Sequence, residues 1–430
     1  MIPIYKNPKA SEWSTILKRP TQSYANIETD AKTIFNEVYA ERDKAILKYA
    51  KRFDHYQNTF FNVSNQEMDV AIDKVSDELK NAIQDAFQTI YKFHKAQSHF
   101  NSPKIETKKG VFCWQKKKPI QKVGLYIPGG SAPLFSTVLM LAIPAKIAKC
   151  HEIILCTPPS KNGEIHPAIL YTAQLCGITQ IFKVGGIQAI AGMTFGTESI
   201  PKVYKIFGPG NQYVTIAKQI ATTYGVAIDM PAGPSELLIY ADKTCIPEFV
   251  AADLLSQAEH GEDSQVILVA REMETILQVN TALGDQIKNI PRQAIAEKAI
   301  ANSKCILMKN IESAFNLINS YAPEHLIIAT NQAETLSEKV VNAGSVFLGN
   351  LTPESAGDYA SGTNHTLPTN AYAKQYSGVN LDAFMKTITY QTLDENGVNS
   401  IGSTVEIMAE TEGLTAHKNA MTLRLKSLNL

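Results

Sequence analysis

Short apolar runs alternate with helix-length segments through most of this chain, and this alternation restricts its fold more than any other feature. The predicted strands are residues 123–127, 153–156, 181–184, 203–207, 237–240, 266–269, 305–308, 326–328 and 345–348. Strands separated by single helices form parallel sheets that helices cover on both faces. The sequence therefore predicts an α/β fold class, with two tandem Rossmann-like α/β/α sandwich domains.

The two ends of the chain have a different texture. Apolar residues at helical spacing predict helices over 31–53 and 69–98, and we expect the second α/β unit to pack against this helical N-terminal segment. Beyond about Thr369 the pattern fades into a polar segment and a final amphipathic helix over 415–427. A small C-terminal helical tail of this length cannot fold alone, so it must dock elsewhere.

Composition excludes several classes of protein. The 430 residues are 44% hydrophobic, enough for two or three domains, and 41 basic residues balance 41 acidic ones. No net field therefore attracts nucleic acid or an anionic membrane. The six cysteines form no C-x-x-C pair, no run of eighteen apolar residues occurs, and the N-terminus has no signal-peptide pattern. These features predict a soluble cytoplasmic protein with reduced thiols.

Gln257 and His260 lie three residues apart near the C-terminal end of a helix predicted over 247–260. They share one helix face and offer a nitrogen and an oxygen to a metal ion. The alternative is a histidine stabilised by the helix dipole beside an incidental glutamine. The spacing alone leaves both interpretations open.

Glu324 and His325 stand directly before the strand predicted over 326–328. Neighbouring side chains of an extended segment point to opposite sides, so we expect separate roles for the two. Histidine can accept a proton at neutral pH, and glutamate can activate water. The alternative is a helix end followed by a solvated loop.

Two further polar segments lie in the C-terminal part. Residues 357–368, with Asp358 and His365, read as a glycine-punctuated loop after the last strand, where α/β proteins place ligands. Glu412 and His417 flank the start of the final helix. An isolated histidine there is more often structural than a ligand.

Three strand-to-helix turns are rich in glycine. They contain Tyr126-Ile-Pro-Gly-Gly, Gly185-Gly-Ile-Gln188 and Gly208-Pro-Gly-Asn211. No G-x-G-x-x-G fingerprint is present. Three such turns on consecutive elements of one sheet would let backbone amides approach a phosphate-bearing ligand.

These segments together resemble the histidinol dehydrogenase family across essentially the full chain. The matching segments are GLYIPGG (124–130), VGGIQAIAGM (184–193), GPGN (208–211), DMPAGPSE (229–236), LLSQAEH (254–260), YAPEHL (321–326), AGDYASGTNHTLPT (356–369) and EGLTAH (412–417). The resemblance implies an NAD-dependent, zinc-assisted, four-electron oxidation of L-histidinol to L-histidine through the aldehyde, the last step of histidine biosynthesis. It also implies that the two sandwiches are incomplete and similar to aldehyde dehydrogenases.

The resemblance carries residue roles to matching positions. The one zinc ion per subunit would be held by Gln257, His260, Asp358 and His417. NAD would contact Tyr126, Gln188 and Asn211, with Glu324 activating water and His325 acting as general base. Substrate contacts would come from Ser235, Gln257, His260, His325, Asp358, His365, Glu412 and His417.

The resemblance further implies a homodimer whose tail crosses to the partner, so that His417 and Glu412, with His365 as a further candidate, complete the neighbouring site. The expected division is an arm (1–20), a substrate and metal domain (21–102 with 233–378), a cofactor domain (103–232) and a dimerisation tail (379–430).

Three competing interpretations are weighed against this one. A thiol-dependent aldehyde dehydrogenase would use Cys113 or Cys150, yet neither lies near the polar segments. A zinc hydrolase with Glu324 as base would not need three glycine turns. A non-catalytic scaffold would not explain why nearly every polar segment carries His, Asp or Glu.

Overall fold

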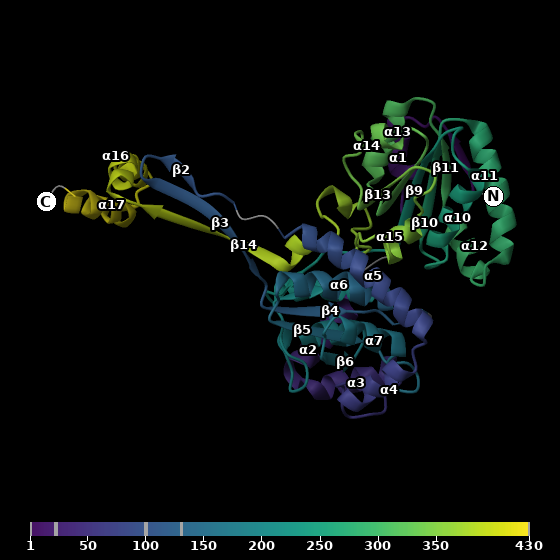
Figure 1. Ribbon diagram of the computed structural model, residues 1–430, viewed down its shortest axis with the longest axis horizontal. Coiled ribbons are helices and arrows are strands. Elements are labelled where there is room, and N and C mark those ends of the chain that lie inside the picture. The colour runs from purple at the N-terminus through teal and green to yellow at the C-terminus, as the bar shows by residue number, and fades with distance from the viewer. Residues whose placement is uncertain (1, 21–24, 99–101, 130–131, 429–430) are drawn as a thin grey trace.

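Two α/β units lie one above the other, and a narrow arm projects from between them (Figure 1). The computed structural model describes residues 2–20, 25–98, 102–129 and 132–428. Within these residues the strands form a five-stranded sheet, a six-stranded sheet and a three-stranded sheet. The predicted α/β class with two tandem units is confirmed.

The five-stranded sheet is parallel throughout. Its strands, in spatial order, are β6 (Gln180–Lys183), β5 (Glu152–Thr157), β4 (Lys122–Tyr126), β7 (Lys205–Phe207) and β8 (Ala227–Ile228). The intervening helices are α6 (Phe135–Ala148), α7 (Pro167–Leu175), α8 (Gly186–Phe195) and α9 (Gln212–Thr223). Neighbouring residues Ile154 and Leu155 are both fully buried in separate apolar clusters. Burial on both faces explains why these strands read as continuous apolar runs.

The N-terminal helices cover this same sheet. They are α2 (Ala25–Glu41), α3 (Asp43–Phe53), α4 (Asn65–Asp73) and α5 (Asp77–Ala96). Phe35 of α2 packs in the cluster that contains Ala189 of α8, and Ile90 of α5 packs in the cluster that contains Leu139 of α6. The expectation that these helices pack on the second unit is therefore wrong. Helical periodicity identifies a buried face but not the surface that covers it.

The six-stranded sheet is also parallel and forms the second unit. Its strands, in spatial order, are β1 (Ile4–Lys6), β11 (Lys304–Leu307), β10 (Gln265–Ala270), β9 (Glu236–Ala241), β12 (His325–Ala329) and β13 (Ser345–Leu348). The helices are α1 (Ala10–Ile16), α10 (Pro247–Ala258), α11 (Met273–Gln286), η1 (Ile287–Asn289), α12 (Gln293–Ala301), α13 (Ile311–Tyr321), α14 (Ala333–Ser337) and α15 (Glu354–Tyr359). The N-terminal residues thus belong to this unit through β1, which the sequence reading did not predict.

The projecting arm combines residues from two distant parts of the chain. It contains β2 (Ile105–Lys108), β3 (Val111–Pro119), β14 (Met385–Leu393), α16 (Glu395–Thr411) and α17 (Thr415–Leu428). Two short helices, η2 (Tyr372–Lys374) and η3 (Leu381–Phe384), precede β14 in the chain. Strand β14 pairs antiparallel with β3 along its whole length. Residues 105–119, expected in the cofactor domain, therefore belong to the arm.

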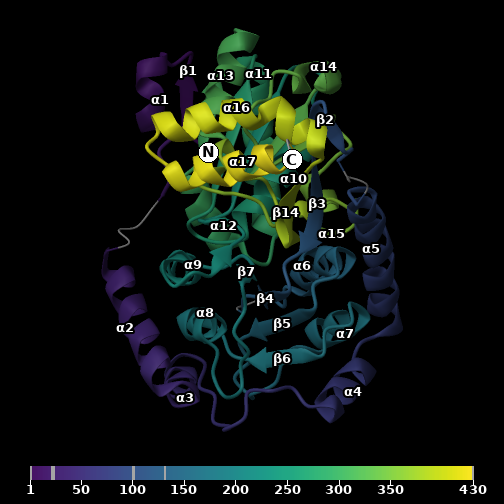
Figure 2. The same cartoon turned by 90° about the vertical axis from the view of Figure 1, so that its left-hand side faces the viewer.

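The arm ends away from the two units, with α16 and α17 side by side (Figures 1 and 2). The prediction from sequence missed β14 and α16. Most residues of both elements are exposed or half-buried, and the buried residues of α16 are two glycines and an alanine, so the pattern of a core-facing element is weak there. Helix α17 packs against α16, but none of its described residues is buried, so much of its surface is left uncovered by this chain. Among the described helices, none combines the length and apolarity needed to cross a membrane.

Candidate active site

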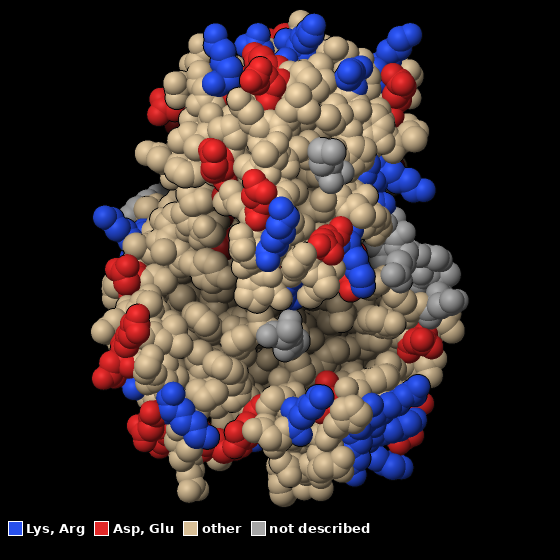
Figure 3. Space-filling model, turned by 90° about the vertical axis from the view of Figure 1, so that its right-hand side faces the viewer, with Lys and Arg blue, Asp and Glu red and all other residues tan. Residues whose placement is uncertain are grey.

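A cavity of about 340 Å³ lies between the two units, within the size range of ligand sites. The face between the units is visibly hollowed (Figure 3). On the five-stranded sheet the cavity meets the turn after the C-terminal end of β7. On the six-stranded sheet it meets residues at the starts of β9, β10 and β12: Ser235, Ser264, Glu324 and His325. Residues of the segment 357–368, which follows the C-terminal end of a strand as expected, also line the cavity, so the six-stranded unit contributes from both ends of its strands.

Three side chains form a compact group that could hold a metal ion. His260 follows α10, while Glu354 and Asp358 stand one turn apart on α15. One ligand atom from each lies within 4.8 Å of the other two. The segment around Asp358 is thus helical at its start, where the sequence reading expected a loop. Because α15 is only six residues long, it lacks the periodicity that identifies a helix from sequence.

Gln257 adds a fourth group to this cluster. It is 1% exposed, and with its amide nitrogen turned toward Glu354, Nε2 donates to Oε2 across 3.0 Å. This hydrogen bond fixes the orientation of the amide, and the carbonyl oxygen remains free to bind a metal ion. Gln257 and His260 therefore converge on one site, as the interpretation of a metal site required.

The charges in this cluster fit a divalent cation. Burial raises the pKa of the Glu354 carboxyl well above its usual range. The His325 imidazole opposes this shift, and the nearby carboxylates of Asp358 and Glu324 add to it. Ionised carboxylates crowded in a buried site need a positive charge among them. One imidazole nitrogen together with carboxylate and amide oxygens is a donor set that zinc accepts.

Glu324 and His325 lie at the edge of this cluster and are 7% and 4% exposed. Glu324 Oε2 accepts the Glu236 amide across 2.8 Å and lies 3.6 Å from His325 Nδ1. The two side chains therefore line one cavity, and the expectation that they point to opposite sides is wrong. Strand β12 begins at His325, so strand alternation does not extend to Glu324.

The hydrogen bonds define which nitrogen of His325 is available. Nδ1 lies 3.3 Å from the Glu236 carbonyl oxygen, which can only accept, so Nδ1 carries the proton. Nε2 has no hydrogen-bond partner and lies 3.6 Å from Asp358 Oδ1. Burial lowers the pKa of this imidazole, but the carboxylates of Glu354 and Glu324 outweigh burial and raise it above the ordinary value. A cation in the cluster would offset this effect of the carboxylates.

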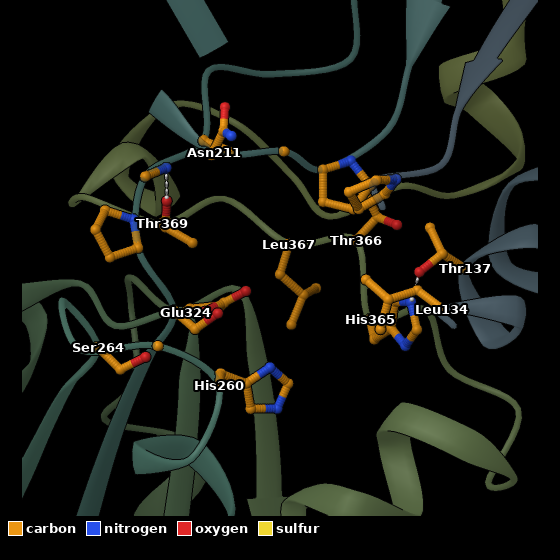
Figure 4. A pocket seen from close by; sticks show the side chains of 18 of the residues that line it. Leu134, Thr137, Asn211, His260, Ser264, Glu324, His365, Thr366, Leu367 and Thr369 are labelled. Carbon is orange, nitrogen blue, oxygen red and sulfur yellow. Dashed lines mark hydrogen bonds between the residues drawn. The ribbon is translucent and has the colours of Figure 1, made fainter. Parts of the chain in front are cut away.

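His365 connects the two units beside the cavity. Its Nδ1 lies 2.9 Å from the Asp358 carbonyl oxygen and its Nε2 lies 3.1 Å from the Thr137 hydroxyl of α6 (Figure 4). The carbonyl requires a proton on Nδ1, so Nε2 accepts from Thr137. Burial lowers the pKa of this imidazole and favours its neutral form. His365 therefore belongs to the cavity of its own chain, contrary to the suggestion that it completes a neighbour's site.

The side of the cavity opposite His260 and Glu324 carries Asn211 (Figure 4). The Asn211 side-chain oxygen caps α9 by accepting the amides of Tyr213 and Val214, which leaves its amide group free. Behind this turn, Lys218 and Asp229 form a buried ion pair. Lys218 donates to the Gly208 carbonyl and Asp229 accepts the Gly208 amide, each across 2.8 Å.

Tyr126 and Gln188 lie behind the second glycine turn. The Tyr126 hydroxyl accepts the Gly186 amide across 3.0 Å, and Gln188 Nε2 donates to Asp54 across 3.2 Å. Both side chains are buried, and neither is among the residues that line the cavity in the described structure. Gly130, the last residue of the first turn, lies outside the described residues.

Glu412 and His417 lie in the arm. Both are exposed, and neither is among the described residues that line this chain's cavity. The structure thus brings together Ser235, Gln257, His260, Glu324, His325, Asp358 and His365, with Asn211 facing them.

The cavity lining includes charged residues that were not singled out from the sequence, among them Glu354, Lys218 and Asp229. Glu354 stands four residues before Asp358, a spacing that would have placed both carboxylates on one helix face had the segment been read as a helix. Lys218 and Asp229 are eleven residues apart on different elements, and no local pattern connects them.

Comparison with known proteins agrees with this geometry. Residues 17–425 match the family model described as "Histidinol dehydrogenase". A histidinol dehydrogenase of Bacteroides thetaiotaomicron is 56% identical over 100% of both chains, and one of Vibrio parahaemolyticus is 48% identical over 99% of this chain and 98% of the relative. The crystal structure of histidinol dehydrogenase from Elizabethkingia anophelis superposes with a TM-score of 0.97 at 55% identity, covering 100% of this chain and 99% of that one. This chain belongs to the histidinol dehydrogenase family, the oxidoreductases of the last step of histidine biosynthesis.

Proposed function

We propose that this chain oxidises L-histidinol to L-histidine in two successive NAD-dependent steps within the cavity between its two units. The observation that carries the proposal is the meeting of His260, Glu354 and Asp358 beside His325 and Glu324. A metal-ligand group and an acid–base pair in one cavity suit an amino alcohol that must be held while protons leave it.

Zinc would be held by Gln257, His260 and Asp358 of this chain, with His417 supplied by a second subunit. When bound, zinc supplies an anchor for the imidazole and amine nitrogens of the substrate, since it takes neutral nitrogen donors and has no redox chemistry. Glu354 supports this site through its hydrogen bond with Gln257. Partners of this kind orient the ligands of a metal.

In the first oxidation His325 acts as the general base. Its unprotonated Nε2 takes the hydroxyl proton as hydride leaves the carbinol carbon for NAD, giving L-histidinaldehyde and NADH. The Glu236 carbonyl holds the proton on Nδ1, so the imidazole presents the correct nitrogen.

In the second oxidation Glu324 activates water. Its carboxylate takes a proton from water as the water oxygen adds to the aldehyde carbon, and the hydrate then loses hydride to a second NAD to give the acid. Ser235 and His365 line the same cavity and would position the substrate. Retaining a reactive aldehyde in one cavity prevents its loss to solvent.

NAD would bind against the glycine turns of the five-stranded unit, with Asn211 in direct contact. Tyr126 and Gln188 stand behind the turn at 185–186 and would act on the cofactor through it in this conformation. Backbone amides at such turns suit phosphate groups.

The arm supports a homodimer with shared active sites. Large apolar side chains on α16 and α17 are exposed, including Ile407 at 64%, Met408 at 59% and Leu423 at 58%. If a second copy covers these side chains, the arm of each chain would place its Glu412 and His417 at the cavity of the other chain. Reciprocal exchange of this kind is what twofold symmetry requires. The six free cysteines suit a reducing, cytoplasmic setting.

Mixing two inactive variants tests the shared sites. His417→Ala and His325→Asn homodimers would each be inactive, whereas subunit exchange would give hybrids with one intact site. Random exchange should restore about a quarter of normal turnover. No recovery after exchange, verified by mass spectrometry of tagged subunits, would rule out the shared arrangement.

The positions of the two candidate thiols, Cys113 in the arm and the buried Cys150, disfavour the thiol-dependent alternative. Burial raises the pKa of Cys150 to about 12, and no cysteine is among the described residues that line the cavity. The hydrolase alternative predicts metal-dependent hydrolysis without reduction of NAD. The deciding experiment is therefore NADH formation from L-histidinol before chelation, after chelation and after zinc is restored. We expect two NADH per histidinol, loss on chelation and recovery with zinc.

A further inference from the structure

A buried ion pair stands directly behind Glu324 and His325. Arg19 comes from the segment between α1 and α2, and Glu236 is the first residue of β9. Their side chains are 14% and 3% exposed. The guanidinium binds the carboxylate through two parallel contacts, Nε with Oε1 and Nη2 with Oε2, the second at 2.8 Å. This two-point geometry is specific to arginine.

The same guanidinium also holds the end of α13. Nη2 donates to the Tyr321 carbonyl across 2.8 Å, and the guanidinium carbon lies 4.0 Å from the centroid of the Tyr321 ring. The Tyr321 hydroxyl donates in turn to Gln265 across 2.9 Å. Arg19 therefore connects the N-terminal segment, β9, β10 and the residue three places before Glu324.

Glu236 touches both groups of the proposed acid–base pair through its backbone. Its amide donates to Glu324 Oε2, and its carbonyl faces His325 Nδ1. Its carboxylate also accepts the amide of Asn370 across 2.8 Å, at the end of the segment that carries His365. A shift of this one residue would move the carboxylate that activates water, the imidazole and the substrate-facing segment together.

We propose that Arg19 and Glu236 are positioning residues that hold Glu324 and His325 in reacting geometry. This inference rests on the roles proposed above for those two side chains. Without Arg19, the Glu236 carboxylate would stand unpaired in a buried site beside the carboxylate of Glu324. The two carboxylates would move apart to relieve their repulsion. This movement would change the contacts that hold the acid–base pair in place.

Two variants remove the clamp in different ways. Arg19→Lys keeps the charge and loses the two-point contact, while Arg19→Met combined with Glu236→Gln removes both charges and leaves none unpaired. We expect kcat for histidinol oxidation to fall about 10- to 100-fold in each, the usual effect of losing an orienting partner. The KM for NAD and the zinc content should stay within twofold of the unaltered enzyme, because the hydrogen bonds of the clamp involve none of the proposed zinc ligands and none of the glycine turns.

Arg42→Lys is the matched control. Arg42 also donates to a backbone carbonyl, that of Gly196 across 2.8 Å, and stacks over Tyr39, but it lies on the five-stranded unit. It should leave kcat unchanged. Equal losses in Arg19→Lys and Arg42→Lys would show a general cost of losing an arginine and would overturn the proposal.

A double-mutant cycle separates positioning from general structural damage. In a background that carries both His325→Asn and Glu324→Gln, Arg19→Lys should lower the residual kcat by less than twofold, because both groups that it positions are already absent. A full additional 10-fold loss there would show that Arg19 acts elsewhere and would overturn the inference.

Failure of the proposed function would give a different result. The single variants His325→Asn and Glu324→Gln would then keep normal turnover, whichever residue stands at position 19. Thermal unfolding of each variant identifies any that do not fold, and the double variant, with no stranded charge, decides the case if Arg19→Lys is unstable.

Discussion

The two units meet the cavity with opposite kinds of chemistry. The five-stranded unit contributes a glycine- and proline-rich strand-to-helix turn and uncharged side chains of α6, and the charged residues Lys218 and Asp229 that it adds to the lining are paired with each other. The six-stranded unit contributes ionisable side chains directly to the cavity, among them His260, Glu324 and His325.

This difference follows from what each side must bind. A cofactor that carries its own reactive group needs close approach and fixed backbone donors, which glycine turns provide. A small amino alcohol needs a metal anchor and groups that move protons, which only side chains supply. Changes on the two sides should therefore separate in kinetics, with the six-stranded side governing kcat and the five-stranded side governing the KM for NAD.

The largest effect is expected for His325, the proposed general base. His325→Asn should lower kcat about 1,000-fold, within the range for loss of a positioned general base. Zinc content and the KM for NAD should not change, because Nε2 faces substrate. The measurement is steady-state NADH formation with parallel metal analysis. Loss of zinc in this variant would instead indicate that His325 is a metal ligand, and would contradict its assignment as a group that only moves protons.

Glu354→Gln should come next. We expect zinc affinity to fall about 10- to 100-fold, because the amide cannot reproduce the carboxylate that orients Gln257 beside His260 and Asp358. Titration with a competing chelator measures the affinity without relying on turnover. The control is Glu152→Gln, which alters a partly buried carboxylate paired with Lys122 on the other unit. Unchanged zinc affinity in Glu354→Gln would remove Glu354 from the metal site.

On the five-stranded side, Gly208→Ala should raise the KM for NAD about tenfold, or about 1.4 kcal/mol of binding free energy. Gly208 has φ +137°, and an added Cβ would lie 2.1 Å from the Tyr126 carbonyl oxygen. The turn must shift away from the cofactor, while kcat at saturating NAD should change little.

Gly225→Ala is the control for Gly208→Ala. Gly225 has φ +79° with no atom near the added Cβ, so it imposes backbone strain without the clash. A fall in kcat for Gly208→Ala with no change in the KM for NAD would contradict the division between the two units.

The smallest effect concerns Asp54, which holds Gln188 behind the second turn. Burial raises the pKa of its carboxyl from 3.8 to about 6. Folding therefore favours the protonated form, and this contribution to stability is present below pH 3.8 and disappears as pH rises through 6. Asp54→Asn lacks this dependence. The melting temperature of the variant minus that of the unaltered enzyme should therefore increase by about 2 °C between pH 4.5 and pH 7.5. Asp285→Asn, at an exposed position, should show no such trend.

The predictable parts of the fold share one physical feature. Strands such as β5 and β10 are buried on both faces, so their apolar runs mark them in the sequence, and the predicted strand boundaries lie within two residues of those observed. Strand β14 escaped prediction because its exposed residues form a strand only by pairing with β3, more than 260 positions earlier. Helix α15 escaped because six residues carry too little periodicity.

The α/β class, the order of the buried elements, the glycine turns and the histidines that line the cavity could all be predicted from the amino-acid sequence. All of these depend on local composition or spacing. Tertiary structure alone decided that helices α2 to α5 cover the first sheet, that Glu354 faces Gln257 and that Arg19 clamps Glu236 across 217 positions. Contacts between distant segments produce no periodic pattern in the sequence. A single residue on each segment is enough to pair a charge or to cover an apolar side chain, and nothing near either residue identifies the other.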